Sequence, residues 1–345
     1  MAVELVGKQR LWLAVTVSLS AASIAAVFAA TAGEGGWQML AGMRPVYLLA
    51  SIGFVLLLWI MEGLRLQVCL QIIGGKIRLL DALEVHLASS FAANITPFSS
   101  GGPPVATYFL CRKGLPLDQS LTLVTMRLLL TFAFFIITVP LILIFFNSMM
   151  GFTWWLQVLV MAIVIFILGL IAIFFYLLLH PASIRHLVRW AVNLRPVKRF
   201  LPDPNGSSLK AYRQLLVFSN TLALLFRGDR WKLGLVLLYT MLIWITFFAI
   251  GPVLLYGLGL NIPVTLTVAR QIVLYFVISY IPLPGGSGVA ELGMASLFAS
   301  AVPKGLLATF VAGWRILTYH SGILAGAPVL LRLARRAPVR VSQPG

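Results

Sequence analysis

Two interruptions in long apolar segments hold the residue types best suited to chemistry. Residues 94–104 read NITPFSSGGPP, and residues 281–291 read IPLPGGSGVAE. Prolines and clustered glycines cannot continue a helix, so some peptide groups here lose their internal hydrogen-bond partners. At membrane depth, such backbone is tolerated only where protein surrounds it or where it borders a water-filled cavity. Each interruption is therefore predicted to line a site.

A lone arginine follows each interruption. Arg127 comes 30 residues after Pro97, and Arg315 comes 31 residues after Pro284. The planar guanidinium suits phosphate, and backbone N–H groups at the two glycine pairs would add hydrogen-bond donors for an anion. The alternative for each arginine is that its side chain snorkels to the nearest lipid headgroups.

Glu291 lies at the start of the short helix predicted after the second interruption, where the helix dipole favours a carboxylate. It is a functional candidate, because ionisable groups within a membrane are costly. The alternative is a capping residue that also forms an ion pair with Arg315 or Arg270. The other acids in apolar segments, Glu62 and Glu84, and the four histidines show no spacing typical of a metal site or a catalytic motif. We therefore predict a binding site with no catalytic residues, no metal and no cofactor.

The predicted substrate-binding residues come from both interruptions and from the two arginines that follow them. They combine hydroxyl groups, close-approach glycines, prolines and charged groups. The set is Thr96, Pro97, Ser99, Gly101, Gly102, Arg127, Pro284, Gly285, Gly286, Ser287, Gly288, Glu291 and Arg315.

The elements that position these residues must be membrane helices. The chain has 345 residues, of which 60% are hydrophobic and 10% are charged, and its mean hydropathy is +0.99. This composition is typical of polytopic membrane proteins. The net charge is +17, but the basic residues lie between apolar segments, where they orient the chain and meet anionic headgroups. Nucleic acid is not an expected partner.

Six apolar runs are long enough to span a bilayer. The two interrupted regions, 82–110 and 264–301, consist of pieces that are short for a crossing, so each is predicted to be a re-entrant helix pair. Two full spans in each region is the alternative. The predicted fold is an all-α polytopic membrane protein with about six transmembrane helices and two Pro/Gly-broken re-entrant pairs. The six runs cover roughly 11–32, 46–66, 120–146, 154–179, 233–258 and 305–331.

Lysine and arginine gather on one side of the predicted topology. They precede the first span, flank the first interruption, fill the loop 181–232 and form the basic tail 332–345. By the positive-inside rule this side is cytoplasmic, and both termini are predicted to lie there.

The interruptions occupy corresponding places in two halves of the chain. A unit of two spans, an interrupted pair and a third span predicts repeats at 1–147 and 152–331. An odd number of crossings in each unit gives the two repeats opposite topology. Corresponding breaks in inverted halves point to a midplane site with alternating access. The alternative is a chance coincidence of two breaks.

The two motifs resemble the flippase-like transmembrane region of lysylphosphatidylglycerol synthases, which many stand-alone bacterial and archaeal membrane proteins share. The sequence departs from that pattern at Pro103 and Met126, where many relatives carry an acid, which puts a charge-coupled step in the first half in doubt. The resemblance covers nearly the whole chain and rests on IPLPGGSGVAE at 281–291 with Trp314, Arg315, Thr318 and Tyr319, supported by NITPFSSGG at 94–102 with Tyr108 and Leu110.

This resemblance implies a protein that flips a lipid or lipid-linked headgroup between the leaflets of a prokaryotic cell membrane, with an anionic phospholipid or lipid-linked substrate as its partner. The bifunctional synthases add a soluble aminoacyl-transfer domain, whereas the sequence stops at Gly345, so synthesis of lysylphosphatidylglycerol is not expected. The alternatives are a membrane-embedded enzyme acting on lipid headgroups and a non-catalytic scaffold subunit. A homo-oligomer is compatible with each of these functions.

Overall fold

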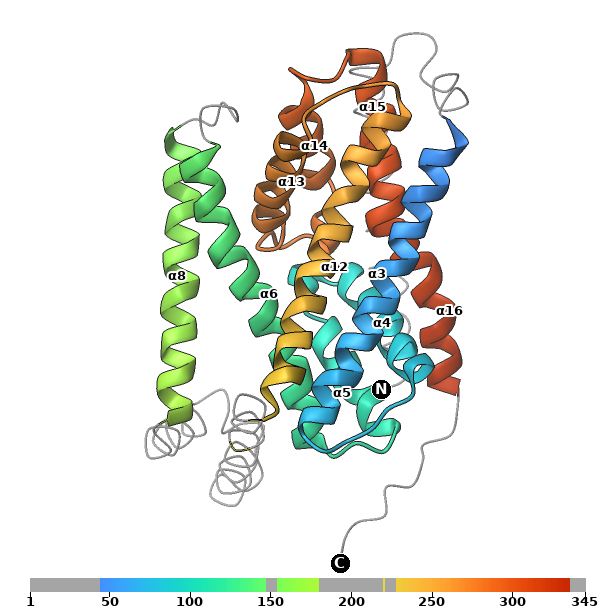
Figure 1. Ribbon diagram of the computed structural model, residues 1–345, viewed down its shortest axis with the longest axis vertical. Coiled ribbons are helices and arrows are strands. Elements are labelled where there is room, and N and C mark those ends of the chain that lie inside the picture. Colours follow the sequence, from blue (N-terminus) through green and yellow to red (C-terminus); the bar gives the residue numbers. More distant parts are fainter. Residues whose placement is uncertain (1–43, 147–153, 180–219, 221–227, 336–345) are drawn as a thin grey trace, which may run out of the picture.

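The protein is built from long helices (Figure 1), several of which are apolar. The computed structural model describes residues 44–146, 154–179, 220 and 228–335, and every regular element within these ranges is helical. In this part of the chain, four helical segments are long and apolar enough to cross a membrane. A further apolar helix, α8 (Trp154–Leu179), packs against the segment Leu117–Phe145. The four are α3 (Pro45–Ile72), α6 (Leu117–Phe145), α12 (Arg230–Gly257) and the continuous run of α15 (Lys304–Arg315), the π-helical turn η3 (Ile316–His320) and α16 (Ser321–Arg335).

These helices confirm the predicted all-α polytopic membrane fold. They coincide with five of the six predicted runs, with their ends shifted by a few residues. The run predicted at 11–32, most of the loop 181–232 and the tail beyond residue 335 lie outside the described residues. The total number of spans and the cytoplasmic position of the termini stay predictions.

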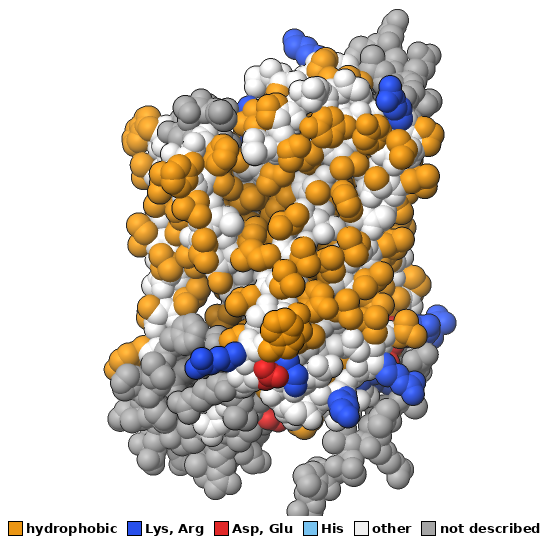
Figure 2. Space-filling model, in the orientation of Figure 1, with side chains coloured by type: hydrophobic (Ala, Val, Ile, Leu, Met, Phe, Trp, Pro, Cys, Tyr) orange, Lys and Arg blue, Asp and Glu red, His pale blue; other side chains and the backbone are white. Residues whose placement is uncertain are grey.

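The outer surface of the helix bundle is apolar. Large hydrophobic side chains such as Leu49 on α3, Ile144 on α6 and Phe166 on α8 are more than half exposed. Figure 2 shows hydrophobic side chains over the middle of the visible face, with lysine and arginine toward its two ends. Contiguous apolar surface on this scale suits lipid rather than water as the surrounding solvent.

Each interrupted region folds into two helices joined by a short 3-10 turn. With 16 and 15 residues, the longer helix of each pair extends about 24 Å and about 22 Å, less than the ~30 Å hydrocarbon core. The two pairs lie toward opposite ends of the bundle, and their turns contact each other (Figure 1). The first region is α4 (Leu79–Asn94), η1 (Pro97–Ser99) and α5 (Gly102–Arg112), and the second is α13 (Val264–Ile278), η2 (Pro284–Gly286) and α14 (Val289–Phe298).

The two turns share one backbone conformation. Phe98 has φ 55° and ψ 19°, and Ser99 has φ 55°, while Gly285 has φ 56° and ψ 17°, and Gly286 has φ 62°. Glycine adopts this left-handed conformation freely, whereas other residues lose about 1–2 kcal/mol each. Among the described residues, Phe98 and Ser99 are the only non-glycine residues with positive φ. The inverted repeat of the two halves stays a prediction, to which this match adds a geometric argument.

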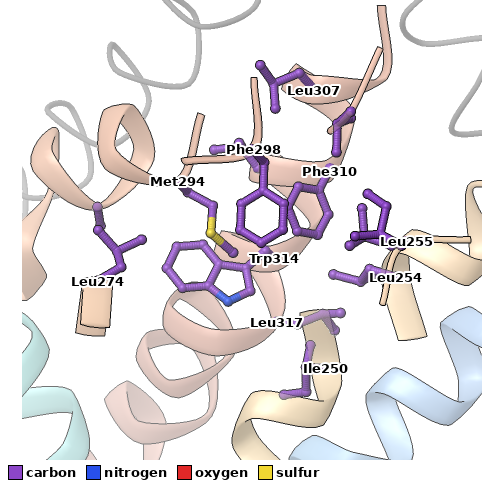
Figure 3. Packing of buried hydrophobic residues seen from close by; sticks show 14 of the residues in the cluster. Ile250, Leu254, Leu255, Leu274, Met294, Phe298, Leu307, Phe310, Trp314 and Leu317 are labelled. Carbon is purple, nitrogen blue, oxygen red and sulfur yellow. The ribbon is translucent and has the colours of Figure 1, made fainter. Parts of the chain in front are cut away.

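An aromatic cluster in the half of the bundle that holds α13 and α14 fixes the position of α15. Trp314 is buried among Met294, Phe298 and Phe310, which come from α14 and α15 (Figure 3). The Phe298 and Phe310 rings meet edge to face, with their centroids 5.1 Å apart. Because Trp314 immediately precedes Arg315, this packing also fixes where the Arg315 side chain begins.

Helix α16 lies against α4 through a pair of small residues. A Cβ added at Gly326 would lie 2.4 Å from the Leu87 carbonyl oxygen and 2.7 Å from the Phe91 Cβ, and Gly322 lies one turn away on the same face. Glycines four residues apart allow close backbone approach, as in other membrane helix pairs.

We therefore expect Gly326→Val to separate α16 from α4 and to destabilise the protein by about 1–3 kcal/mol, the usual cost of overpacking. Thermal unfolding in detergent measures this effect. Leu324→Val is the matched control, because Leu324 is 73% exposed on the same helix and should unfold like the parent. Equal unfolding temperatures for both variants would contradict close packing at Gly326.

Candidate functional site

The two breaks and the π-helical turn meet at Tyr319. The Tyr319 hydroxyl donates to the Asn94 carbonyl oxygen at 3.1 Å, and the Asn94 side-chain amide donates to the Tyr319 carbonyl oxygen at 3.4 Å. On the other side, a Cβ added at Gly285 would lie 2.0 Å from the Tyr319 ring. The C-terminal end of α4, the turn η2 and the turn η3 are therefore joined at one residue.

A buried ion pair closes the second break. The Arg315 Nε donates to the Glu291 Oε1 at 2.7 Å, and its Nη2 donates to the Gly285 carbonyl oxygen at 2.8 Å and to the Ser287 hydroxyl at 3.2 Å. The Tyr319 ring covers the guanidinium, whose carbon lies 3.8 Å from the ring centroid. The Arg315 side chain is only 4% exposed and that of Glu291 is fully buried, so this arginine acts as a clamp on the break.

Glu291 also caps the helix that it begins. Its Oε2 accepts a hydrogen bond of 2.6 Å from the backbone N–H of Gly288, the residue that precedes α14. The predicted alternative of a cap that forms an ion pair is therefore confirmed, with Arg315 as the partner. Arg270 is placed differently, with its guanidinium carbon 5.4 Å from the centre of the Phe298 ring.

A second charged cluster lies between α3, α4 and α6. The Glu62 carboxylate oxygen Oε2 lies 2.7 Å from Arg65 Nη2, 3.5 Å from Arg127 Nε and 3.9 Å from His86 Nδ1. Arg127 Nη2 lies 3.2 Å from the same histidine nitrogen, which accepts if the ring carries its proton on Nε2. Arg65 also donates a hydrogen bond from Nη1 to the hydroxyl oxygen of Thr240 on α12, at 3.4 Å. Four helices therefore meet at this cluster.

The two clusters differ in charge and in accessibility. With a neutral histidine, one carboxylate and two guanidinium groups leave the Glu62 cluster one positive charge in excess, whereas Glu291 and Arg315 balance. The Arg127 side chain is 37% exposed, compared with 4% for Arg315. Of the two predicted arginines, only Arg127 offers an accessible cation in this conformation.

Two of the predicted anion-binding donors are used within the chain. The backbone N–H of Gly101 donates to the Thr96 hydroxyl at 2.8 Å, and that of Gly286 donates to the Leu283 carbonyl oxygen at 3.0 Å. The expectation that these glycine pairs present free N–H groups is wrong for Gly101 and Gly286, because the turns satisfy their own backbone. Gly101 is instead needed for close approach, since a Cβ there would lie 2.9 Å from the Ala92 carbonyl oxygen.

The remaining predicted residues line the two turns. Pro97 and Pro284 begin η1 and η2, Ser99 is exposed, and Gly102 is buried against α4. Gly288 has φ 89° and ends the second turn.

Three residues of the Glu62 cluster were missed as site residues. Glu62 and Arg65 lie one helical turn apart in an apolar segment, and opposite charges three residues apart on one face of a membrane helix are a recognisable signal. His86 carries no such signal, because its partners come from α3 and α6, far away in the sequence. Within the described residues, no group of His, Cys, Asp and Glu is placed to hold a metal ion.

An ion network at one end of the bundle ties the first pair to α16. Lys113 bonds to Asp81 and Glu84, and Glu84 also bonds to Arg332. Arg112 adds a hydrogen bond of 2.9 Å to the Leu333 carbonyl oxygen. Partial burial opposes the charge on Lys113, but its hydrogen bonds to Asp81 and Glu84 outweigh burial and raise its pKa. This network ties the N-terminal end of α4 to the C-terminal ends of α5 and α16.

The described fold and its charged clusters define a multi-pass, all-α membrane protein with two broken helix pairs and two clusters of ionisable groups among its helices. The chain belongs to the family described as the lysylphosphatidylglycerol synthase TM region, whose model matches residues 11–326. It is similar to a UPF0104 membrane protein of Archaeoglobus fulgidus, with 30% identity over 328 residues that cover 90% of this chain and 94% of the relative. The family resemblance drawn from the two motifs is thus confirmed.

Proposed function

We propose that this protein translocates a lipid or lipid-linked headgroup between the two leaflets of its membrane. The observation that carries the proposal is the contact between the turns η1 and η2, together with one charged pair that closes the second break and a charged cluster on α3, α4 and α6. A headgroup crossing a bilayer needs polar partners at depth, and broken helices supply them without exposing backbone to lipid. The name of the family, which refers to a synthase of a charged phospholipid, supports a lipid substrate.

Arg127 is the residue that we propose binds the anionic part of the headgroup. It is accessible, it belongs to the cluster with excess positive charge, and its fork matches a phosphate. A substrate contact at Arg315 would require the ion pair with Glu291 to open first, as an alternate conformation of the second break would allow. The proposed route therefore has one open cationic site and one closed site in the described conformation.

Arg127→Gln should abolish the attraction for an anionic headgroup while leaving the fold intact, because Arg65 still neutralises Glu62. Hydrogen bonds to charged groups contribute about 1.5–3 kcal/mol, so the apparent lipid affinity should fall at least about tenfold. Arg127→Lys should keep only part of the parent's lipid affinity, because the point charge of an ammonium does not reproduce the two-pronged guanidinium. Arg65→Gln is the comparison: it removes the same charge from a side chain that is 4% exposed, so it should lower the unfolding temperature more than Arg127→Gln does but lower the lipid affinity less.

The test uses purified protein in phosphatidylcholine vesicles that carry a fluorescent phosphatidylglycerol, with a membrane-impermeant quencher to follow its exchange between leaflets. Mass spectrometry of the recovered lipid separates translocation from a headgroup enzyme, which would leave a covalent change. Parent protein that changes the lipid covalently, or that moves none, would contradict the proposed function. An Arg127→Gln variant that matches the parent would contradict the role of Arg127 alone.

A further inference from the structure

The first break exposes side chains that the second break lacks or buries. Phe98 is 57% exposed, and Ser99 and Ser100 are exposed beside it. At the second break, Gly286 and Ser287 are buried. Because the two turns share one backbone conformation, the difference lies in the side chains and in what surrounds them.

Phe98 occupies a backbone conformation that glycine would adopt without strain. The corresponding residue of the second turn is Gly285, with φ 56° against 55° for Phe98. Strain of this kind persists where the surrounding structure enforces it, and it gathers at functional sites. Packing does not account for the phenylalanine, because a ring that is more than half exposed leaves most of its contact area unused.

We propose that Phe98, Ser99 and Ser100 form a lipid-contact tip that binds the glycerol–phosphate region of a phospholipid. The tip follows the C-terminal end of α4, and its turn η1 contacts η2, so a lipid bound there would lie where the two breaks meet. The aromatic ring suits the first methylenes of an acyl chain, and the two hydroxyls can donate to ester and phosphate oxygens. This inference rests on the proposed function and adds a contact residue, Phe98, to it.

The inference is tested with Phe98→Gly, Phe98→Ala and Phe98→Tyr. Phe145→Ala is the matched control, because Phe145 is 71% exposed at the end of α6, away from both breaks. Each protein is unfolded by heat in detergent with and without phosphatidylglycerol, and its translocation rate is measured in the vesicles described above. The first measurement detects lipid contact without requiring transport.

Without lipid, Phe98→Gly should unfold at a higher temperature than the parent, because glycine accepts the positive φ. With phosphatidylglycerol, Phe98→Gly and Phe98→Ala should gain less stability than the parent and move lipid several-fold more slowly. Phe98→Tyr keeps the ring and should behave like the parent, as should Phe145→Ala.

Two results would overturn the lipid-contact tip. The first is an equal gain in unfolding temperature on adding phosphatidylglycerol for Phe98→Gly and for the parent. The second is a lower unfolding temperature for Phe98→Gly than for the parent without lipid, which would show that the ring packs within the protein. Failure of the proposed function gives a different pattern. Parent protein would then move no lipid, while the Phe98 variants would still lose the lipid-dependent gain in stability.

Discussion

Arg315→Met is expected to destabilise the folded protein by about 3–5 kcal/mol, because removing one partner of a buried ion pair leaves the other charge uncompensated. The charge left without its partner is the carboxylate of Glu291, whose side chain is fully buried. The same substitution removes the hydrogen bonds to the Gly285 carbonyl oxygen and to the Ser287 hydroxyl. The yield of monodisperse protein in detergent and its unfolding temperature measure the loss.

The double variant Glu291→Gln with Arg315→Met separates a missing charge from a missing side chain. It removes both charges at once, so it should recover much of the stability that Arg315→Met loses. The stability of Arg315→Lys should lie between that of the parent and that of Arg315→Met, since a lysine ammonium reaches fewer of the hydrogen-bond partners than the arginine guanidinium does. If Arg315→Met is as stable as the parent, the ion pair does not clamp the second break.

Gly285→Ala is expected to cost about 2–5 kcal/mol, because it combines a left-handed residue, about 1–2 kcal/mol, with overpacking, about 1–3 kcal/mol. The added Cβ would meet the Tyr319 ring at 2.0 Å, and the backbone φ is +56°. Tyr319 in turn holds Asn94 at the first break. The substitution should therefore also loosen the contact between the two breaks and lower lipid translocation.

Gly259→Ala is the control that separates the cost of the left-handed backbone from the cost of the contact with Tyr319. Gly259 has φ +78° and nothing within 4 Å of an added Cβ, so this control should lose only the cost of the left-handed conformation. Thermal unfolding of both variants gives the comparison. Equal losses at Gly285 and Gly259 would show that Tyr319 moves aside freely, and the close approach at the second break would then have no structural consequence.

The sequence alone determined the helices and the places where they break. Long apolar runs predict spans, because a bilayer core requires about 20 apolar residues in a helix, and α3, α6, α8, α12 and the run from α15 to α16 follow those runs closely. Proline and glycine clusters located η1 and η2, because these residues stop a helix through local backbone chemistry. Such signals are contained in neighbouring residues, so no knowledge of the tertiary structure is needed to detect them.

Only the tertiary structure decided which charges meet. Arg127 and Arg315 look equivalent in the sequence, each one arginine about 30 residues beyond a break, yet one is accessible beside Glu62 and His86 and the other is sealed between Glu291 and Tyr319. The π-helical turn that brings Tyr319 onto Gly285 has no composition that marks it in advance. Whether a buried arginine is a clamp or a binding group depends on which distant helices supply its acceptors. That choice is made when helices pack, because desolvation makes an unpaired charge costly only after its neighbours are in place.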